Sequence, residues 1–284
     1  MIKKQLCSAR QLQALMRAGL CLIVDCRFSL TDPENGRSDW IESHIPGARY
    51  AHLDQDLAGP VTAKTGRHPL PDPAEFARFL SSIGWSRDLL LVAYDDASNA
   101  IAARLWWLMR YFNLPASLLD GGFAAWQRAG LPLESGSAII HSSDPVVLTG
   151  RSDMIVSCDE IQEGQTLGRL KVIYARASQR FSGEEEPLDS RAGHIPGSIN
   201  RPYHLNLDEN SNFKEPEVLR EEFDRLLAGR KASQVAHSCG SGVTACHNYF
   251  AMELAGLSPS KLYPGSWSEW IRDPARPIET GPAQ

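Results

Sequence analysis

The chain has 284 residues, of which 43% are hydrophobic and 22% are charged, and its net charge is −5. Such a composition is typical of a globular protein in water, and the length predicts about two domains of ordinary size. The mildly negative charge argues against nucleic acid or an anionic membrane surface as a partner. No stretch is long and apolar enough to span a bilayer, and the first residues lack the apolar run of a secretory signal.

The cysteines and histidines show no metal-binding pattern. None of the six cysteines forms a Cys-x-x-Cys pair, and the eight histidines are not spaced as metal ligands. We therefore expect no metal ion and no cofactor. Scattered cysteines without a secretory signal favour reduced thiols, so we expect a cytoplasmic protein.

Four landmarks follow one another in the first half of the chain. Residues 22–27 are an apolar run that ends at an arginine, which predicts a buried strand. The motif Glu-Ser-His-Ile-Pro-Gly-Ala follows at 42–48. A second apolar run at 89–94 precedes the polar loop 95–99, and Asp-Gly-Gly-Phe-Ala-Ala-Trp comes last, at 120–126.

The same landmarks recur in the same order in the second half. The matching segments are 172–176, 192–198, the strand and loop around Cys239, and 264–270. Such self-similarity indicates a duplicated structural unit. In this alignment, Asp96 of the first copy stands where the second copy has Cys239.

Strands alternate with helical patterns such as those at 100–111 and 216–227. This alternation predicts the α/β fold class, with a small and mainly parallel sheet flanked by helices in each copy. Small and polar residues between the two copies indicate a linker. We therefore predict two tandem domains, 1–137 and 150–284.

The second copy contains the clearest candidate for a reactive group. Residues 234–257 predict a short buried strand at 235–237, a glycine loop, and a helix that ends near Gly256. Cys239 then lies between the strand and the helix N-terminus. Unpaired N–H groups and the helix dipole at that place favour the thiolate, which is the nucleophilic form.

The residues after Cys239 suit anion binding. Gly240 and Gly242 allow the backbone to curl, so that successive N–H groups point at one atom. Ser241 and Thr244 add hydroxyl groups. An inert, buried cysteine in a turn is the alternative, but the glycine loop between a strand and a helix favours a reactive one.

Residues 239–245, Cys-Gly-Ser-Gly-Val-Thr-Ala, resemble the active-site loop of the rhodanese superfamily, and more narrowly that of two-domain 3-mercaptopyruvate sulfurtransferases. The resemblance implies two tandem rhodanese-like domains. The first, 1–137, would be catalytically inactive because Asp96 cannot carry sulfur. The second, 150–284, would be the catalytic domain.

The resemblance also implies a reaction. Cys239 would take sulfur from 3-mercaptopyruvate as a persulfide, with release of pyruvate, and pass it to cyanide or to a thiol such as that of thioredoxin. Gly240, Gly242, Val243 and Thr244 would bind the substrate and the persulfide, in the way that an oxyanion hole binds an anion.

The carboxylate of such a donor needs a basic partner, which the loop lacks. Arg180, in Arg-Phe-Ser-Gly, matches the substrate-binding arginine of the family, and its forked guanidinium suits a carboxylate. Arg176 is a second candidate, although Arg27 at the matching place of the first copy favours a buried ion pair. Leu188 stands where the family usually has a further arginine, and Arg191 follows three residues later.

Ser241 is a candidate for proton transfer. A serine–histidine–aspartate relay is a proposal for this family, and by motif match its histidine would be His44. His44 has the alternative role of a turn histidine, since His194 repeats it in the second copy. The acidic member of the relay stays open.

Three other functions are weighed against this one. Thiosulfate could be the donor, but a dianion would favour basic residues in the loop. A cysteine phosphatase would need an arginine where Ala245 and Cys246 stand. A persulfide carrier or redox-sensing module would accept sulfur once, without turnover.

Overall fold

The computed structural model describes residues 5–137 and 140–282. Contacts between residues divide the chain into two compact units. Unit 1 contains the chain up to Gly59, Leu70–Arg151 and Glu209–Asn212, and unit 2 contains Pro60–Pro69, Ser152–Asp208 and the chain from Phe213 onward. The main division falls between Arg151 and Ser152, and residues 138–139 of the predicted linker lie outside the described ranges. A short segment of the first half, 60–69, belongs to unit 2.

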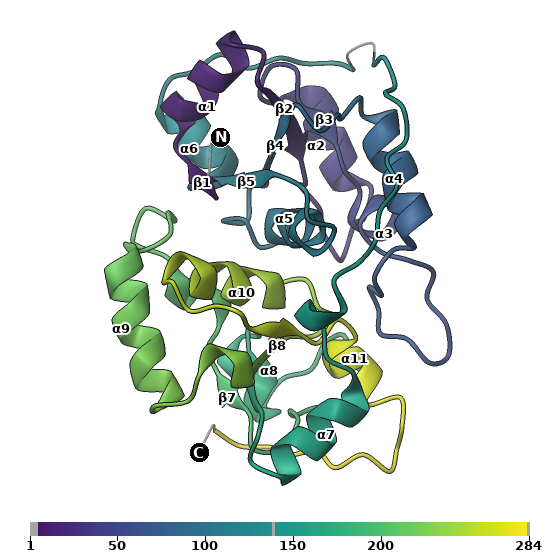
Figure 1. Cartoon of the computed structure of the whole chain (residues 1–284), viewed down its shortest axis with the longest axis vertical. Helices are drawn as coiled ribbons and strands as arrows, with labels where there is room; N and C mark the ends of the chain where they lie inside the picture. The colour runs from purple at the N-terminus through teal and green to yellow at the C-terminus, as the bar shows by residue number, and fades with distance from the viewer. Residues whose placement is uncertain (1–4, 138–139, 283–284) are drawn as a thin grey trace. The chain divides into compact units, whose positions relative to one another are not determined.

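Unit 1 is built on a five-stranded parallel sheet with the order β1-β5-β4-β2-β3 (Figure 1). The strands are β1 (Leu6–Cys7), β2 (Cys21–Asp25), β3 (Arg49–Tyr50), β4 (Leu90–Tyr94) and β5 (Ala116–Leu119). Every residue of the middle strand β4 is buried. This is expected of a parallel sheet that helices cover on both faces.

The helices of unit 1 supply that cover. They are α1 (Ala9–Arg17), α2 (Asn35–Glu42), α3 (Leu53–Asp56), α4 (Pro73–Ser82), α5 (Ala102–Tyr111) and α6 (Gly122–Arg128). Leu12 of α1 and Trp126 of α6 share a buried core with Ile23, Val92 and Tyr94 of the sheet. Helix α5 packs against β4 and β5 from the other side (Figure 1).

Unit 2 repeats the arrangement with four parallel strands in the order β7-β6-β8-β9. They are β6 (Lys171–Tyr174), β7 (Ile199–Asn200), β8 (Val235–Ser238) and β9 (Lys261–Leu262). The order matches that of unit 1 without β1, and one parallel bridge between Ile155 and Leu262 takes the place of β1. The duplication that the sequence landmarks indicate is therefore present in the fold.

Helices also flank the sheet of unit 2. They are η1 (Ser152–Met154), α7 (Cys158–Thr166), α8 (Ser178–Ser182), η2 (Tyr203–Asn206), α9 (Pro216–Leu227), η3 (Ala232–Gln234), α10 (Ala245–Leu254) and α11 (Ser266–Trp270). Ile161 of α7 and both tryptophans of α11 lie in one core with the sheet. Helix α10 packs against β8 and α9. The predicted α/β class with parallel sheets is confirmed, and the predicted helix 216–227 coincides with α9.

None of the helices in the described ranges is long and apolar enough to cross a membrane.

The His-Ile-Pro-Gly motif forms the same turn in both units. His44 forms a backbone bridge with Glu134, and His194 forms the equivalent bridge with Glu279. Nδ1 of each histidine lies 2.6 and 2.7 Å, respectively, from a main-chain carbonyl oxygen. Each glutamate carboxylate also accepts the N–H of the glycine in the motif. These shared contacts give the motif a structural role in both copies.

A buried ion pair closes the carboxyl end of β2. Arg27 donates to both carboxylate oxygens of Asp25, and its Nη2 lies 2.7 Å from Oδ2. The hydroxyl of Tyr94 donates to the same Oδ2 at 2.6 Å. Because Asp25 is fully buried, loss of its carboxylate would leave a guanidinium without compensation inside the unit.

We expect Asp25→Ala to lower the free energy of unfolding by about 3–5 kcal/mol, since it strands the charge of Arg27. Asp224→Ala is the matched control, because it removes an exposed carboxylate paired with Arg220 and should change stability by less than about 1 kcal/mol. Urea unfolding followed by circular dichroism measures both. Equal losses in the two variants would contradict the expected role of the buried pair.

Candidate functional site

The glycine loop lies where the sequence predicts it. Strand β8 ends at Ser238, Cys239 follows, and α10 begins at Ala245. Gly256, just beyond α10, has a φ of 69°, as the predicted left-handed cap requires. Cys239 is therefore held between the carboxyl end of an interior strand and a helix N-terminus, with only 2% of its surface exposed.

Donor groups of the loop converge on the Cys239 sulfur. The N–H of Gly242 donates to Sγ at 3.1 Å. Burial raises the pKa of the thiol, but the Thr244 hydroxyl and the N–H groups of Ser241, Ala245 and Gly242 lower it further, so that the pKa lies below its ordinary value of 9.0. The loop thus stabilises the thiolate.

The cysteines of unit 1 have the opposite net pKa shift, because burial is the dominant effect there. It raises the pKa of Cys7 to about 12 and that of Cys21 to about 11. The fully buried Cys26 also has a pKa well above the ordinary value. The low pKa of Cys239 is therefore a property of its loop and not of a buried position.

Contacts with α11 hold the loop in shape. Gly242 has a φ of 77°, and a Cβ at this position would lie 2.2 Å from the Pro264 carbonyl oxygen, so only glycine fits. The N–H of Cys239 donates to Ser266 Oγ at 3.1 Å. Its carbonyl oxygen accepts the N–H of Trp267 at 3.1 Å. Both peptide groups of the nucleophile are thereby fixed.

Most of the predicted site residues come together in unit 2. Besides Cys239 they are Gly240, Ser241, Gly242, Val243, Thr244, Arg176 and Arg180. Val243 is buried, and its carbonyl oxygen accepts the N–H of Cys246, so it closes the turn into α10.

Three arginines surround Gly240. An ideal Cβ on this glycine would lie 3.2 Å from Arg67 Nη2, and 3.9 Å from both Arg180 Nη1 and Arg176 Cδ. The loop itself has no basic side chain. Positive charge next to the nucleophile therefore comes from elsewhere in the chain.

Arg176 is engaged in internal contacts. Its side chain is 2% exposed, and it donates to Glu186 Oε2 at 3.0 Å and to the Gly193 carbonyl oxygen. Its guanidinium carbon also lies 5.1 Å from the centre of the Trp267 ring. The buried ion pair that we considered for Arg176 is present, and it leaves little of the side chain for a substrate.

Arg180 and Arg67 share one carboxylate. Arg180 Nη2 donates to Glu186 Oε1 at 2.6 Å and to Asp189 Oδ2 at 3.2 Å. Arg67 Nη1 donates to Asp189 Oδ1 at 2.7 Å. The side chains of Arg180 and Arg67 are 20% and 29% exposed, whereas both carboxylates are buried. These two arginines are the accessible members of the cluster.

His68 is the histidine beside the loop. Its Nδ1 lies 2.7 Å from Ser241 Oγ, and both residues are buried. It belongs to the segment 60–69, which contacts the rest of unit 2 next to the loop. The N–H of Arg67 anchors this segment, because it donates to Ser268 Oγ at 2.9 Å.

The contacts of His44 lie elsewhere. This residue is fully buried in unit 1, stacks on Trp40, and has its Nε2 3.8 Å from Glu134 Oε2. The geometry therefore corrects the motif match that put His44 in the relay. His68 is the histidine that reaches Ser241, and His44 is the turn histidine that we considered as the alternative.

Asp95, not Asp96, stands in unit 1 where Cys239 stands in unit 2. Each is the first residue after the equivalent interior strand, β4 or β8. Phe123 N–H donates to the carbonyl oxygen of Asp95, as Trp267 N–H donates to that of Cys239. The sequence offers two adjacent aspartates, and only the strand registers distinguish them.

A carboxylate fills the loop of unit 1. Asp95 is fully buried, and its two oxygens accept four backbone N–H groups at 2.7 to 2.9 Å. The donors are Ala97, Asn99, Ile101 and Ala102. The loop of unit 1 thus surrounds an anion of its own, at the place where unit 2 holds sulfur.

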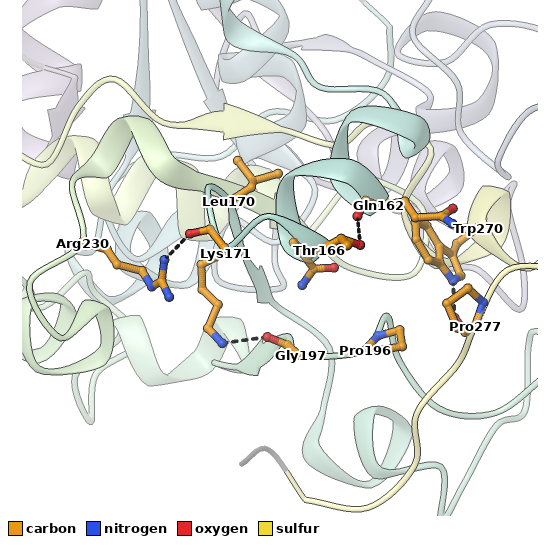
Figure 2. A pocket seen from close by; sticks show the side chains of 11 residues that line it. Gln162, Thr166, Leu170, Lys171, Pro196, Gly197, Arg230, Trp270 and Pro277 are labelled. Carbon is orange, nitrogen blue, oxygen red and sulfur yellow. Dashed lines mark hydrogen bonds between the residues drawn. The ribbon is translucent and has the colours of Figure 1, made fainter.

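A separate pocket of unit 2 lies beside Lys171, the first residue of β6 (Figure 2). It has a volume of about 350 Å³, and Lys171 and Arg230 line it. Each donates to a main-chain carbonyl oxygen, Lys171 to Gly197 and Arg230 to Gly168. Lys171 is the first residue of β6, whereas Cys239 follows the last residue of the parallel strand β8. The length of the strands, about 13 Å, therefore separates the pocket from Cys239. The pocket is not part of the Cys239 site.

Sequence reasoning missed four residues of the Cys239 site, namely Arg67, His68, Glu186 and Asp189. The first two form an Arg-His pair between Gly66 and Pro69, and such a chemically rich loop is a signal of function. No local pattern shows which unit that loop contacts. In the described ranges, no group of three or more acidic, histidine or cysteine side chains could hold a metal ion.

Comparisons with known proteins agree with this geometry. A family model of the rhodanese-like domain matches residues 8–129 and 157–273, once in each half of the chain. The "Probable 3-mercaptopyruvate sulfurtransferase" of Pseudomonas aeruginosa is 46% identical over 286 residues, which cover 99% of this chain and 100% of the relative. The "Thiosulfate sulfurtransferase" of Bos taurus is 30% identical over 282 residues, which cover 94% of this chain and 92% of the relative.

A solved structure shows the same fold. The 3-mercaptopyruvate sulfurtransferase from Leishmania major superposes with a TM-score of 0.83 and 30% identity, covering 95% of this chain and 75% of that one. The resemblance that residues 239–245 carry is therefore confirmed over both copies. The chain belongs to the rhodanese-like domain family and contains two tandem copies of that domain.

Proposed function

We propose that the protein is a 3-mercaptopyruvate sulfurtransferase that carries sulfur on Cys239. The observation that carries the proposal is the convergence of loop N–H groups on the Cys239 sulfur, with arginines beside Gly240. A thiolate next to a carboxylate-binding cation suits attack on a keto acid that bears a thiol. The full-length relative of Pseudomonas aeruginosa, named for this reaction, supports the choice of donor.

In the first step, the Cys239 thiolate attacks the sulfur of 3-mercaptopyruvate. An S–S bond forms while the C–S bond of the donor breaks. The electron pair of the broken bond passes to carbon, which leaves as the enolate of pyruvate. The N–H groups of Ser241, Gly242 and Ala245 stabilise the negative charge of the persulfide, by the physics of an oxyanion hole.

We assign the proton transfer of this step to Ser241 and His68. The donor's thiol loses a proton when the persulfide anion forms, and the carbon of the pyruvate enolate gains one, so the step balances without an external acid. The 2.7 Å contact between Ser241 Oγ and His68 Nδ1 supports this assignment. His68 thus takes the role that the motif match gave to His44.

In the second step, a nucleophile takes the outer sulfur and Cys239 returns as the thiolate. Cyanide becomes thiocyanate, and a thiol such as that of thioredoxin becomes a persulfide. The six cysteines are free thiols, which suits the reducing cytoplasm that we propose as the compartment.

We further propose that the domain formed by unit 1 is inactive. Asp95 has no thiol to carry sulfur, and its carboxylate already occupies the loop donors. All turnover would then depend on Cys239.

Thiosulfate is the second candidate donor. The lack of basic residues in the loop argues against it, but Arg67 and Arg180 bring positive charge to Gly240. The Bos taurus relative is named for that donor. A direct comparison of the two donors decides between them.

We expect the wild-type protein to form thiocyanate from 3-mercaptopyruvate with a higher kcat/KM than from thiosulfate. Cys239→Ser should lose on the order of 10³-fold or more, because serine cannot form a persulfide. Cys158→Ser, at a partly exposed thiol of the same unit, is the control and should retain activity.

Each other outcome of this assay has a distinct meaning. A preference for thiosulfate would replace the donor, and residual turnover in Cys239→Ser would contradict an inactive unit 1. One equivalent of pyruvate per protein without turnover would indicate a persulfide carrier.

The protonation of Cys239 should be visible in the ultraviolet absorbance of its thiolate, measured as wild type minus Cys239→Ser. We expect a midpoint below 9.0, and kcat/KM should fall as the pH falls through that midpoint because protonation removes the nucleophile. Thr244→Val deletes a donor to the sulfur and should raise the midpoint. A wild-type midpoint at or above 9.0 would overturn the role given to the loop.

His68→Gln should lower kcat with 3-mercaptopyruvate by about 100-fold, as loss of a general acid–base group does. Ser241→Ala should have a similar effect, and the double variant should be little worse than either, because the two residues act as a unit. His44→Gln, assayed per folded molecule, should retain activity. Loss of activity in His44→Gln but not in His68→Gln would restore the motif-based assignment.

A further inference from the structure

We propose that the pocket beside Lys171 is a second binding site of unit 2, and that it takes a small organic phosphate monoester. Lys171 and Arg230 bind the phosphate group, and the organic part lies along the rest of the pocket. The proposal rests on two cations without a carboxylate partner, on free amide donors next to them, and on the size of the pocket. It is independent of the sulfur transfer proposed for Cys239.

Two cations line the pocket, and none of the described residues that line it is acidic. Lys171 Nζ donates to the Gly197 carbonyl oxygen at 2.7 Å, and Arg230 Nη1 donates to that of Gly168 at 3.0 Å. Each cation thus uses one N–H group, and within the described ranges neither forms an ion pair with a carboxylate. The other donors of both groups are available to a ligand.

The charge of the two cations is not neutralised locally. Burial and the positive charge of Arg230 lower the pKa of Lys171, and Glu279 opposes this shift only as the smallest of the three contributions. The Glu279 carboxylate is itself engaged, because it accepts the Gly197 N–H at 2.9 Å and lies 3.7 Å from His194 Nε2. A bound anion would therefore relieve a repulsion that the protein alone leaves in place.

Neutral donors lie beside the cations. An ideal Cβ on Gly197 would lie 3.8 Å from Gln165 Nε2, so this amide group and the Lys171 ammonium group flank the same residue. Gln162 also lines the pocket, and its Oε1 accepts from Arg276 Nη1 at 2.8 Å. The amino group of Gln162 has no partner in the part of the chain that the structure describes. Amide donors of this kind complement the oxygen atoms of a ligand.

The pocket is too large for a simple ion. Its volume of about 350 Å³ is roughly ten times the volume that one water molecule takes up in the liquid, and it lies in the range of pockets for organic ligands. Figure 2 shows the two cations toward one end of the pocket, and Trp270 with Pro277 toward the other. Together with Pro196, these apolar side chains suit an uncharged organic group.

A phosphate monoester matches these features better than a carboxylate does. At neutral pH such a group carries a charge of about −1.5 to −2 and three acceptor oxygens. The two cations combine a forked guanidinium with a compact ammonium, and both kinds of side chain commonly bind phosphate. A lone carboxylate would leave one positive charge without compensation. The apolar end and the amide donors then favour an ester with an organic part over inorganic phosphate.

A purely structural role for the two cations is the alternative. Lys171 and Arg230 would then only cap the carbonyl oxygens of Gly197 and Gly168, the second of which lies just beyond the C-terminus of α7. That role predicts no ligand. The arginines next to Gly240 are another place at which a phosphate group could bind, so the test must separate the two sites.

The test is a calorimetric titration of the protein with two esters, adenosine 5′-monophosphate and ribose 5-phosphate, at low ionic strength because salt screens the charges. We expect at least one ester to bind with a Kd below about 1 mM. Inorganic phosphate, adenosine and ribose should bind at least about 10-fold more weakly, because each lacks either the charge or the organic part. If neither ester binds, or if any of these three compounds binds as tightly as the esters, the proposal is wrong.

Lys171→Gln and Arg230→Gln should each raise the Kd of the ester about 10-fold, as loss of a charge-assisted hydrogen bond predicts. The matched controls are Lys261→Gln and Arg169→Gln. Lys261 is the first residue of β9, as Lys171 is of β6, and Arg169 is exposed and adjacent in sequence to Gly168. Each control removes one positive charge from unit 2 but no residue that lines the pocket, and should change the Kd less than about twofold. Equal effects in the two pairs of variants would overturn the proposal.

Gln165→Glu is a second test that leaves both cations and their carbonyl contacts in place, so it covers the case in which a lysine or arginine variant fails to fold. The new carboxylate next to Gly197 should compete with the phosphate group and raise the Kd at least about 10-fold. Arg180→Gln, at the Cys239 site, should leave the Kd unchanged. Loss of binding in Arg180→Gln but not in Lys171→Gln would put the phosphate at the Cys239 site and would overturn the proposal.

Discussion

A negatively charged sulfur in the interior of unit 2 depends on the N–H groups that the glycine loop turns toward it. Burial by itself favours the neutral thiol, as the raised pKa values of Cys7 and Cys21 show. At Cys239 the donors of the loop outweigh burial. They keep their direction because Gly242 adopts a left-handed conformation and because α11 binds both peptide groups of the nucleophile. The remaining features of the site are arranged around this sulfur.

The two units show that the same loop geometry can surround different chemical groups. In unit 1 the same strand–loop–helix connection surrounds the carboxylate of Asp95, and the same contact from the following helix holds its carbonyl oxygen. An anion-binding loop therefore exists in both copies. The residue at its centre determines whether the loop surrounds a carboxyl group, whose pKa burial raises to about 6, or a cysteine thiol, whose pKa the loop donors lower.

The positively charged side chains of the site come from outside the loop. Glu186 and Asp189 bind the guanidinium groups of the arginines, so that the cations approach one another without a large excess of charge. The segment 60–69 provides Arg67 and His68, although it precedes most of unit 1 in the chain. The segment 60–69, the stretch with Arg176 to Asp189 and the loop after β8 are far apart in the sequence and meet beside Cys239.

The sequence by itself determined the secondary-structure elements and the repeat, because local patterns of residues encode these features. Apolar periodicity and glycine placement predicted β8, the loop, α9 and α10, and the repeated landmarks predicted two α/β domains with Cys239 as the nucleophile. Tertiary structure alone decided the partners of the nucleophile. His68 and Ser241 are 173 positions apart, and Arg67 and Asp189 are 122 apart, so no local pattern joins them. Likewise, the choice of Asp95 over Asp96 and of His68 over His44 follows from strand register and contact geometry, because adjacent or repeated residues of one type are equivalent until the chain is folded.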